Sequence, residues 1–158
     1  MDIAAEICAT LADYWLPSIY ENKIRSQRTR SLAIDIPLRE NTAEIQYTLL
    51  GIELKVGKNR FACPDLATAR YMRVFARLGC REFAIPYDIT KISAAADELE
   101  TSWQRTVLLI IELTKDKPSR AISLGRSKTV KSLRESVDMI GAGQAMPHFD
   151  QETRQRRS

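Results

Sequence analysis

The stretch from Ser31 to Cys63 decides the fold, and it reads SLAIDIPLRENTAEIQYTLLGIELKVGKNRFAC. From Ser31 to Leu38, apolar residues alternate with polar or small ones, which predicts a half-buried strand. The alternation resumes from Glu44 to Val56, but it changes phase at Gly51, where we expect a β-bulge. After a turn, Arg60 to Cys63 form a short return strand. The stretch therefore predicts a three-stranded antiparallel meander.

Helical patterns flank this meander. An N-terminal helix begins after the cap Asp2 and breaks at Pro17. A second helix runs from the cap Asp65 to Gly79, and Arg81 to Tyr87 form a fourth strand. Two long helices follow, one from the cap Thr90 to about Lys115 and one from Pro118 to Gly141.

The order of these elements predicts a mixed α+β fold: an N-terminal helix, the meander, a helix, a fourth strand, and two long C-terminal helices packed on the sheet. The patch from Leu108 to Ile111 is apolar on nearly every side, which predicts a central, buried position for its helix. We expect one compact domain over residues 1–146 and a mobile polar tail over residues 147–158.

The composition excludes several classes of protein. The chain has 158 residues, 44% hydrophobic and 28% charged, with 6 Gly and 6 Pro, which suits one globular domain. Its longest strongly apolar run, Val107 to Ile111, is too short to span a membrane, so we expect no membrane partner. The single histidine, His148, argues against His-based zinc sites and nucleophile triads. Three dispersed cysteines and the acidic start of the chain indicate a reducing, cytoplasmic setting.

The net charge of +4 hides a strong segregation. Residues 55–81 hold seven Lys or Arg against one Asp, and residues 117–134 hold six Lys or Arg and no acidic residue. Residues 82–116, between them, hold seven acidic residues against three basic ones. Such a pattern gives a molecule with one basic face, or surfaces that neutralise one another.

Glu53-Leu54-Lys55 is the motif with the most specific chemistry. A carboxylate and a lysine two residues apart share one face of a strand, where they can hold a divalent metal and steady the attacking water in phosphodiester cleavage. With Asp35 upstream and the order helix, strands, helix, strand, residues 3–88 resemble the PD-(D/E)xK nuclease superfamily. The resemblance implies that Asp35 and Glu53 bind Mg²⁺ and that Lys55 positions the water.

Two features of this motif favour other interpretations. The superfamily carries its Glu-x-Lys on the third strand, whereas here it lies on the second predicted strand. The hairpin register makes Asp65 a nearer second metal ligand for Glu53 than Asp35, although Asp65 already has a role as a helix cap. If Gly51 shifts the phase, Glu53 and Lys55 are instead ordinary residues on the polar face of a strand. Both interpretations stay open at this point.

A row of arginines is the second candidate site. Arg70, Arg73 and Arg77 recur at i, i+3 and i+7, so they share one face of the predicted helix. Guanidinium groups in a row can bind phosphates along a nucleic-acid backbone. Alternatively, they pair with the acidic residues at 97–100 on the next helix. The full polyanion-binding set that we predict is Arg60, Arg70, Arg73, Arg77, Arg81, Lys128, Lys131 and Arg134.

Three classes of function remain. The first is a non-catalytic binding protein whose arginines contact nucleic acid or another polyanion. The second is a protein-interaction or assembly factor with segregated basic and acidic faces, whose partner carries an acidic surface. The third is a Mg²⁺-dependent nuclease that uses Glu53 and Lys55, and only this class needs a cofactor. The sequence leaves the oligomeric state open.

Overall fold

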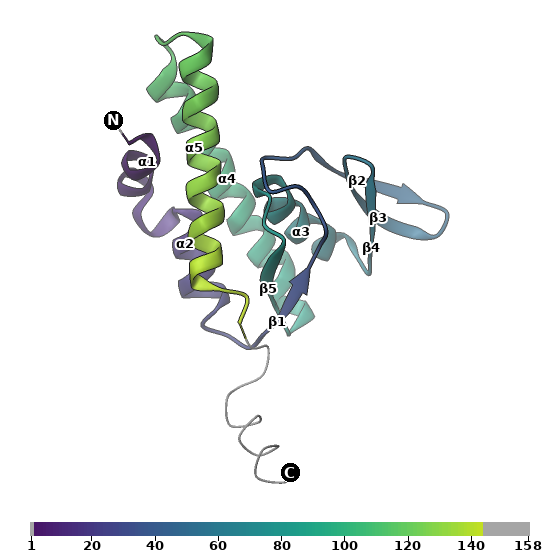
Figure 1. Cartoon of the computed structure of the whole chain (residues 1–158). Helices are drawn as coiled ribbons and strands as arrows, with labels where there is room; N and C mark the ends of the chain where they lie inside the picture. Colours follow the sequence, from purple (N-terminus) through teal and green to yellow (C-terminus); the bar gives the residue numbers. More distant parts are fainter. Residues whose placement is uncertain (1, 144–158) are drawn as a thin grey trace, which may run out of the picture.

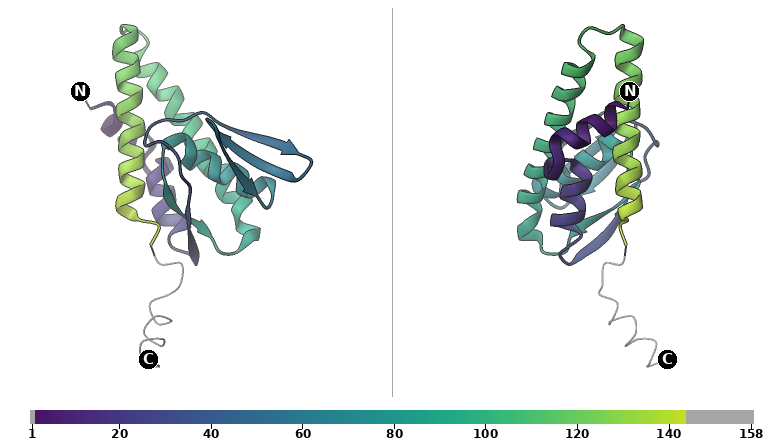
Figure 2. Two further views of the ribbon diagram at one scale, coloured as in Figure 1. Left: turned by 45° about the vertical axis from the view of Figure 1, so that its right-hand side comes forward. Right: turned by 90° about the vertical axis from the view of Figure 1, so that its left-hand side faces the viewer.

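The computed structural model describes residues 2–143, so the predicted tail at 147–158 lies outside the described residues (Figure 1). The elements follow the predicted order of N-terminal helix, three-stranded antiparallel sheet, helix, further strand and two long helices, which confirms the mixed α+β fold. Helices α4 (Ile92–Thr114) and α5 (Ser119–Ile140) form a long antiparallel pair, and the three-stranded sheet projects away from it (Figure 2).

The N-terminal helix is interrupted close to the predicted position. The Asp2 side chain caps α1 (Ile3–Leu11), and a 3-10 turn (Ala12–Tyr14) separates α1 from α2 (Leu16–Ile19). A proline in the first turn of α2 suits this position, because the first N–H groups of a helix have no partner within it. A π-helical turn (Tyr20–Ile24) follows, and α1 and α2 pack against both α4 and α5.

The strands form two separate sheets. A three-stranded antiparallel sheet is confirmed, but the strand predicted at 44–56 is two of its strands. The strand predicted at 31–38 does not belong to this sheet and is shorter. Its residues pair instead with the strand that follows α3, because this pairing places the alternating apolar side chains over the core. The sheets are β1 (Thr29–Ala33) with β5 (Glu82–Pro86), and β2 (Ala43–Thr48), β3 (Gly51–Val56) and β4 (Asn59–Cys63) in the order β2-β3-β4.

The change of phase at Gly51 marks a turn, so the predicted β-bulge is wrong. Leu49 and Leu50 form a two-residue turn between β2 and β3, and Tyr47 pairs with Ile52 across it. A two-residue turn moves the inward-facing positions from odd to even numbers, which gives the same change of phase as a bulge. Gly, Asn and Asp dominate such turns, so the two leucines conceal this one.

Helix α3 (Leu66–Leu78) has the predicted ends. The Asp65 side chain accepts a hydrogen bond from the Thr68 backbone N–H at 2.7 Å, and Gly79 ends the helix in the left-handed region with a φ of 80°. A Cβ atom at Gly79 would collide with the backbone of Arg39. The segment that leads into β2 therefore lies directly against the end of α3.

The aromatic core lies between α3 and β5. The Phe75 ring of α3 stacks on Phe83 of β5 with centroids 4.4 Å apart, and Tyr71 packs beside both. The buried hydroxyl groups have partners: Tyr71 donates to the Ala84 carbonyl, and Tyr20 accepts from the Ala84 N–H at 2.8 Å. These bonds satisfy the polar atoms of an otherwise apolar interior.

Helix α4 differs from its prediction in two places. Asp88, and not Thr90, caps the 3-10 turn (Ile89–Lys91) that leads into α4. Leu108 is 64% exposed and Ile111 56% exposed, so the expected central position is wrong. The α4–α5 pair extends beyond the sheets, which leaves one side of α4 uncovered (Figure 2). Among the described residues, no helix is long and apolar enough to cross a membrane.

Candidate functional site

The predicted nuclease pair lies on the polar face of the three-stranded sheet. Glu53 and Lys55 alternate with the buried Leu54 and Val56 along β3, so they point away from the core. The Glu53 Oε1 atom lies 3.7 Å from the Arg60 Nη1 atom on β4. Glu53 and Lys55 therefore occupy the position that the alternative interpretation gave them, although a turn and not a bulge puts them there.

The predicted carboxylates do not form a three-ligand metal site. Asp65 uses its side chain as the cap of α3. Asp35 follows β1, which pairs with β5 and not with the meander, and its backbone carbonyl accepts a hydrogen bond from Asn59 Nδ2 at 2.9 Å. Within residues 2–143, no three His, Cys, Asp or Glu side chains gather where they could hold a metal ion. Asp35, Glu53 and Asp65 thus do not form a metal site, because the strand before Asp35 belongs to the other sheet and the Asp65 carboxylate caps α3.

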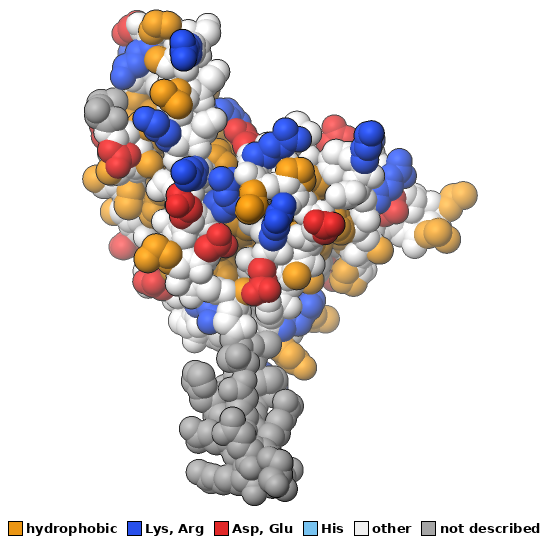
Figure 3. All heavy atoms as spheres, viewed as in Figure 1, with side chains coloured by type: hydrophobic (Ala, Val, Ile, Leu, Met, Phe, Trp, Pro, Cys, Tyr) orange, Lys and Arg blue, Asp and Glu red, His pale blue; other side chains and the backbone are white. Residues whose placement is uncertain are grey.

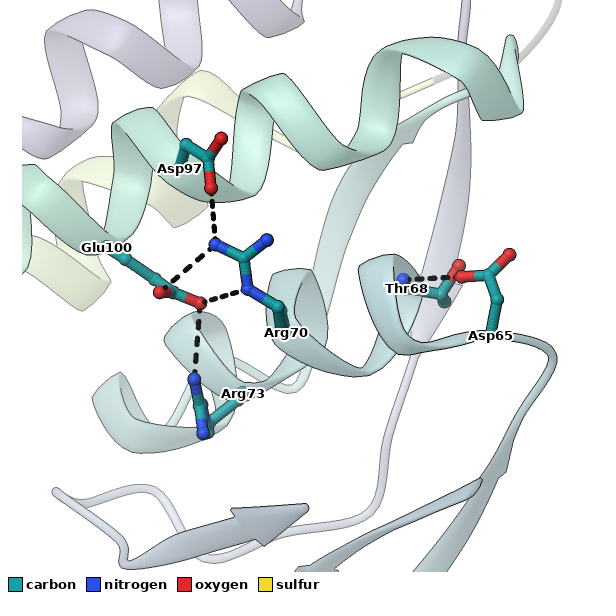
Figure 4. A network of polar contacts seen from close by, with 6 residues as sticks. All are labelled: Asp65, Thr68, Arg70, Arg73, Asp97 and Glu100. Carbon is teal, nitrogen blue, oxygen red and sulfur yellow. Dashed lines mark hydrogen bonds and ion pairs between the residues drawn. The ribbon is translucent and has the colours of Figure 1, made fainter. Parts of the chain in front are cut away.

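The arginine row on α3 divides into two parts. Arg70 donates from Nη2 to Asp97 Oδ1 at 2.5 Å and from Nε to Glu100 Oε1 at 3.2 Å (Figure 4). Arg73 donates from Nη2 to the same Glu100 oxygen at 3.3 Å. The hydrogen bonds to Asp97 and then to Glu100 raise the pKa of Arg70. For these two arginines, pairing with the acidic residues of the next helix is confirmed.

Arg77, the third member of the row, has no such partner. Its guanidinium makes no hydrogen bond or ion pair with another residue between 2 and 143. The side chain is half-buried, and burial lowers its pKa; the nearby charge of Arg73 acts in the same direction, and the charge of Glu100 acts against both. A cation that is partly removed from water and has no hydrogen-bonded anion gains from binding one.

Arg77 lines a groove of about 690 Å³. One wall consists of the segment from Glu40 to Glu44, which includes the first residues of β2. The α4 residues Gln104, Val107 and Leu108 also line the groove, so its lining combines apolar side chains with a strand backbone. The volume falls in the range of about 300–1,000 Å³ that is typical of ligand sites.

A closed ion pair borders this groove. The Arg126 guanidinium of α5 donates to both carboxylate oxygens of Glu40, with a shortest distance of 2.6 Å, and this pairing raises the pKa of Arg126. The same guanidinium lies over the Trp103 ring. Glu44, the other acid of the groove, stands opposite Lys55 in the sheet register. Of the two arginines in the groove, Arg77 is therefore the one without a hydrogen-bonded carboxylate among the described residues.

Three other predicted basic residues contact the protein itself. Arg81 donates from Nε to the Ile36 carbonyl at 2.6 Å, and Arg134 donates from Nη1 to the Leu78 carbonyl at 2.9 Å. The Arg60 Nη1 atom lies 3.7 Å from the Glu53 Oε1 atom on β3. Hydrogen bonds to backbone carbonyls leave the charges of Arg81 and Arg134 available, but they fix the side chains in place.

Sequence reasoning missed Arg39 and Lys58, which line a second hollow of about 490 Å³. This hollow shares residues 40–42 with the groove, so the two lie on either side of that segment. Among the described residues, neither cation has an ion-pair partner, and the same holds for Lys128 and Lys131 on α5. Lys and Arg side chains form a broken band across this face of the molecule (Figure 3). Arg39 and Lys58 lie in turns, where no periodic pattern could reveal them.

No family model, curated protein or solved structure matches this chain. A fold of this kind does not itself specify an activity, so only the geometry and chemistry of the site bear on the function.

Proposed function

We propose that the protein is a non-catalytic binding protein that takes an acidic segment of a partner protein into the groove beside Arg77. The observation that carries this proposal is the half-buried, unpartnered guanidinium of Arg77 in that groove. A carboxylate matches the planar fork of a guanidinium and can accept two hydrogen bonds from it.

The rest of the groove supports a protein ligand. Val107 and the 64% exposed Leu108 offer apolar contact beside the charge. The Glu40–Arg126 pair is already neutral, so outside this pair the charged residues of the groove are Arg77 and Glu44. A guanidinium without a hydrogen-bonded anion next to an apolar wall is the chemistry that recognises a short acidic segment with neighbouring hydrophobic side chains.

The test uses the full chain as the target on which binding peptides are selected from a displayed library of random linear sequences. We expect the selected peptides to carry an Asp, a Glu or a free terminal carboxylate. Their affinity should fall about tenfold or more on Arg77→Gln, since a charge-assisted hydrogen bond is lost. Arg60→Gln is the matched control, because Arg60 is an exposed arginine on β4 outside the groove, and it should leave the affinity unchanged. Selection of uncharged peptides, or equal binding by the two variants, contradicts the proposal.

A second candidate is the binding of a nucleic-acid backbone. The observation that favours it is the pair Arg39 and Lys58, exposed cations that share the second hollow and have no carboxylate partner among residues 2–143. Its signature is an affinity for DNA or RNA that falls steeply with salt and decreases on joint Arg39→Gln and Lys58→Gln substitution. If the protein binds neither DNA nor RNA at low salt, this candidate is contradicted. That result does not bear on the proposed binding of an acidic peptide in the groove.

A further inference from the structure

Strand β2 is an edge of its sheet. It pairs with β3 on one side, and among the described residues no backbone hydrogen bond reaches its other side. In an antiparallel strand, every second residue directs its N–H and C=O toward the neighbouring position, so an edge strand presents a row of unpaired donors and acceptors.

This edge has little of the usual protection against added strands. Natural edges carry proline, charged side chains, above all lysine, or a bulge, and between Ala43 and Thr48 β2 has only the charge of Glu44. The other edge of the sheet, β4, carries Arg60 and is followed directly by Pro64. The two edges therefore differ, and β2 is the more open one.

The β2 edge and the groove are continuous. Ala43 and Glu44 begin the strand, and both line the groove together with Val107 and Leu108 of α4. A segment that enters the groove between β2 and α4 thus comes beside the open edge. Beyond the groove, the edge continues to Tyr47, which is 72% exposed, on the hairpin that projects from the body (Figure 1).

We propose that the partner binds as an extended strand added to the edge of β2, with a carboxylate on Arg77 and an apolar side chain against Val107 and Leu108. This inference rests on the proposed function and specifies its partner as an extended acidic segment. Main-chain hydrogen bonds to β2 supply affinity for any extended backbone, and the charge of Arg77 selects the acidic one. The charge of Arg77 favours an acidic segment as the occupant. A second copy of the chain would bring Glu44 on its own β2 edge, so its binding is an outcome that the experiment separates.

The experiment uses the full chain and the acidic peptide that the library selection yields. The peptide is synthesised in an unmodified form and in two forms that are N-methylated at alternate residues, in opposite registers. N-methylation removes the N–H donors and keeps the side chains, so the register that faces β2 should bind about tenfold more weakly or worse, and the other register should bind nearly as well as the parent. Amide hydrogen exchange should slow at residues 43–47 of β2 and stay unchanged at Asn59–Cys63 of β4.

The outcomes separate this inference from the proposed function. A peptide whose affinity depends on Arg77 but tolerates N-methylation in both registers overturns strand addition and retains the acidic groove. A failure to select any Arg77-dependent peptide overturns both. Slowed exchange in β2 that grows with the concentration of free protein assigns the edge to a second copy of the chain, and it likewise overturns the inference.

Discussion

The two ends of the arginine row on α3 have the same residue type and helical spacing, but they differ in environment. At the first end, Arg70 and Arg73 share the carboxylate of Glu100, and the three side chains are 18–24% exposed. At the other end, the Arg77 guanidinium forms no hydrogen bond or ion pair with a carboxylate among the described residues, and it lines an open groove. The first end holds α3 against α4, and the second is available to a ligand.

The difference arises on the facing helix. Glu100 serves the first end, whereas Trp103 and Gln104, one turn further along α4, line the groove beside Arg77. Position 104 holds a glutamine and not an acidic residue, so this turn of α4 adds no negative charge to the groove. Whether an arginine row on a helix stabilises the fold or is open to a ligand therefore depends on the sequence of the helix that faces it. The sequence of the row alone does not show which helix that is.

The largest effect that we expect is a loss of stability at alkaline pH. It arises in the buried interior behind this row, and the arginines at the two ends of the row do not contribute to it. Burial raises the pKa of the Cys80 thiol and of the Tyr20 hydroxyl to about 12. The unfolded chain loses these protons from about pH 9 upward, so the folded state holds more protons than the unfolded state between about pH 9 and 12. The free energy of unfolding should therefore fall as pH rises through this window, while the arginines stay charged.

Urea unfolding at a series of pH values measures this loss, and Cys80→Ala should reduce its slope above pH 9. An identical slope in the variant would show that the thiol does not contribute.

Next in size is the effect of Glu100→Gln, which tests the first end of the row. The substitution removes the charge that two half-buried guanidinium groups share, so we expect the free energy of unfolding to fall by about 1–2 kcal/mol. The matched control is Glu98→Gln: Glu98 lies on the same helix as Glu100, and its ion pair with Lys23 is more exposed, so this substitution should cost clearly less stability. Equal losses in the two variants would mean that the shared carboxylate does not stabilise the fold specifically.

A smaller effect is expected at the border of the groove. Glu40→Gln leaves Arg126 without its carboxylate, and since the pair is about one-third exposed, the loss in stability should be about 0.5 kcal/mol. Chemical denaturation at low and high salt measures it, and the difference from wild type should shrink at high salt. If the loss is as large as that of Glu100→Gln, the Glu40–Arg126 pair stabilises the fold as much as the carboxylate that Arg70 and Arg73 share.

The smallest effect on stability is expected for Arg77→Met. Methionine keeps the apolar stem and removes an unpartnered charge beside Arg73, so the free energy of unfolding should stay within about 0.5 kcal/mol of wild type or rise slightly. Arg73→Met is the comparison, and it should destabilise the protein because it removes a bond to Glu100. If Arg77→Met destabilises as much as Arg73→Met, the two ends of the row do not differ.

Local patterns predicted the elements well, and long-range pairing escaped them. Asp65 and Gly79 fix the ends of α3 through their own backbone and side-chain chemistry, which the sequence contains. The pairing of β1 with β5 depends on which apolar faces meet in three dimensions, so sequence order misled the prediction. The Glu40–Arg126 pair joins residues 86 positions apart, and no spacing rule could connect them.

The candidate site shows the same division. The periodicity of α3 identified Arg77, but it could not separate Arg77 from Arg70 and Arg73, since the partners of those two lie on another helix. The motif Glu53-Leu54-Lys55 had a specific chemical meaning, but that meaning depended on carboxylates from other elements, and Asp35, Glu53 and Asp65 do not form a metal-binding group. Motifs that need only their own element were predictable, and those that need a second element were not.

Gly79 should tolerate few substitutions although it makes no contact with a ligand in the proposed groove. Any side chain at this position meets the backbone of Arg39, so a substitution pushes residues 39–42 outward and moves one wall of the groove with them. In a scan of all single substitutions, Gly79 should be as intolerant as Arg77 when ligand binding is scored. Measuring abundance in parallel distinguishes the two positions, because only the glycine should also lower the amount of folded protein.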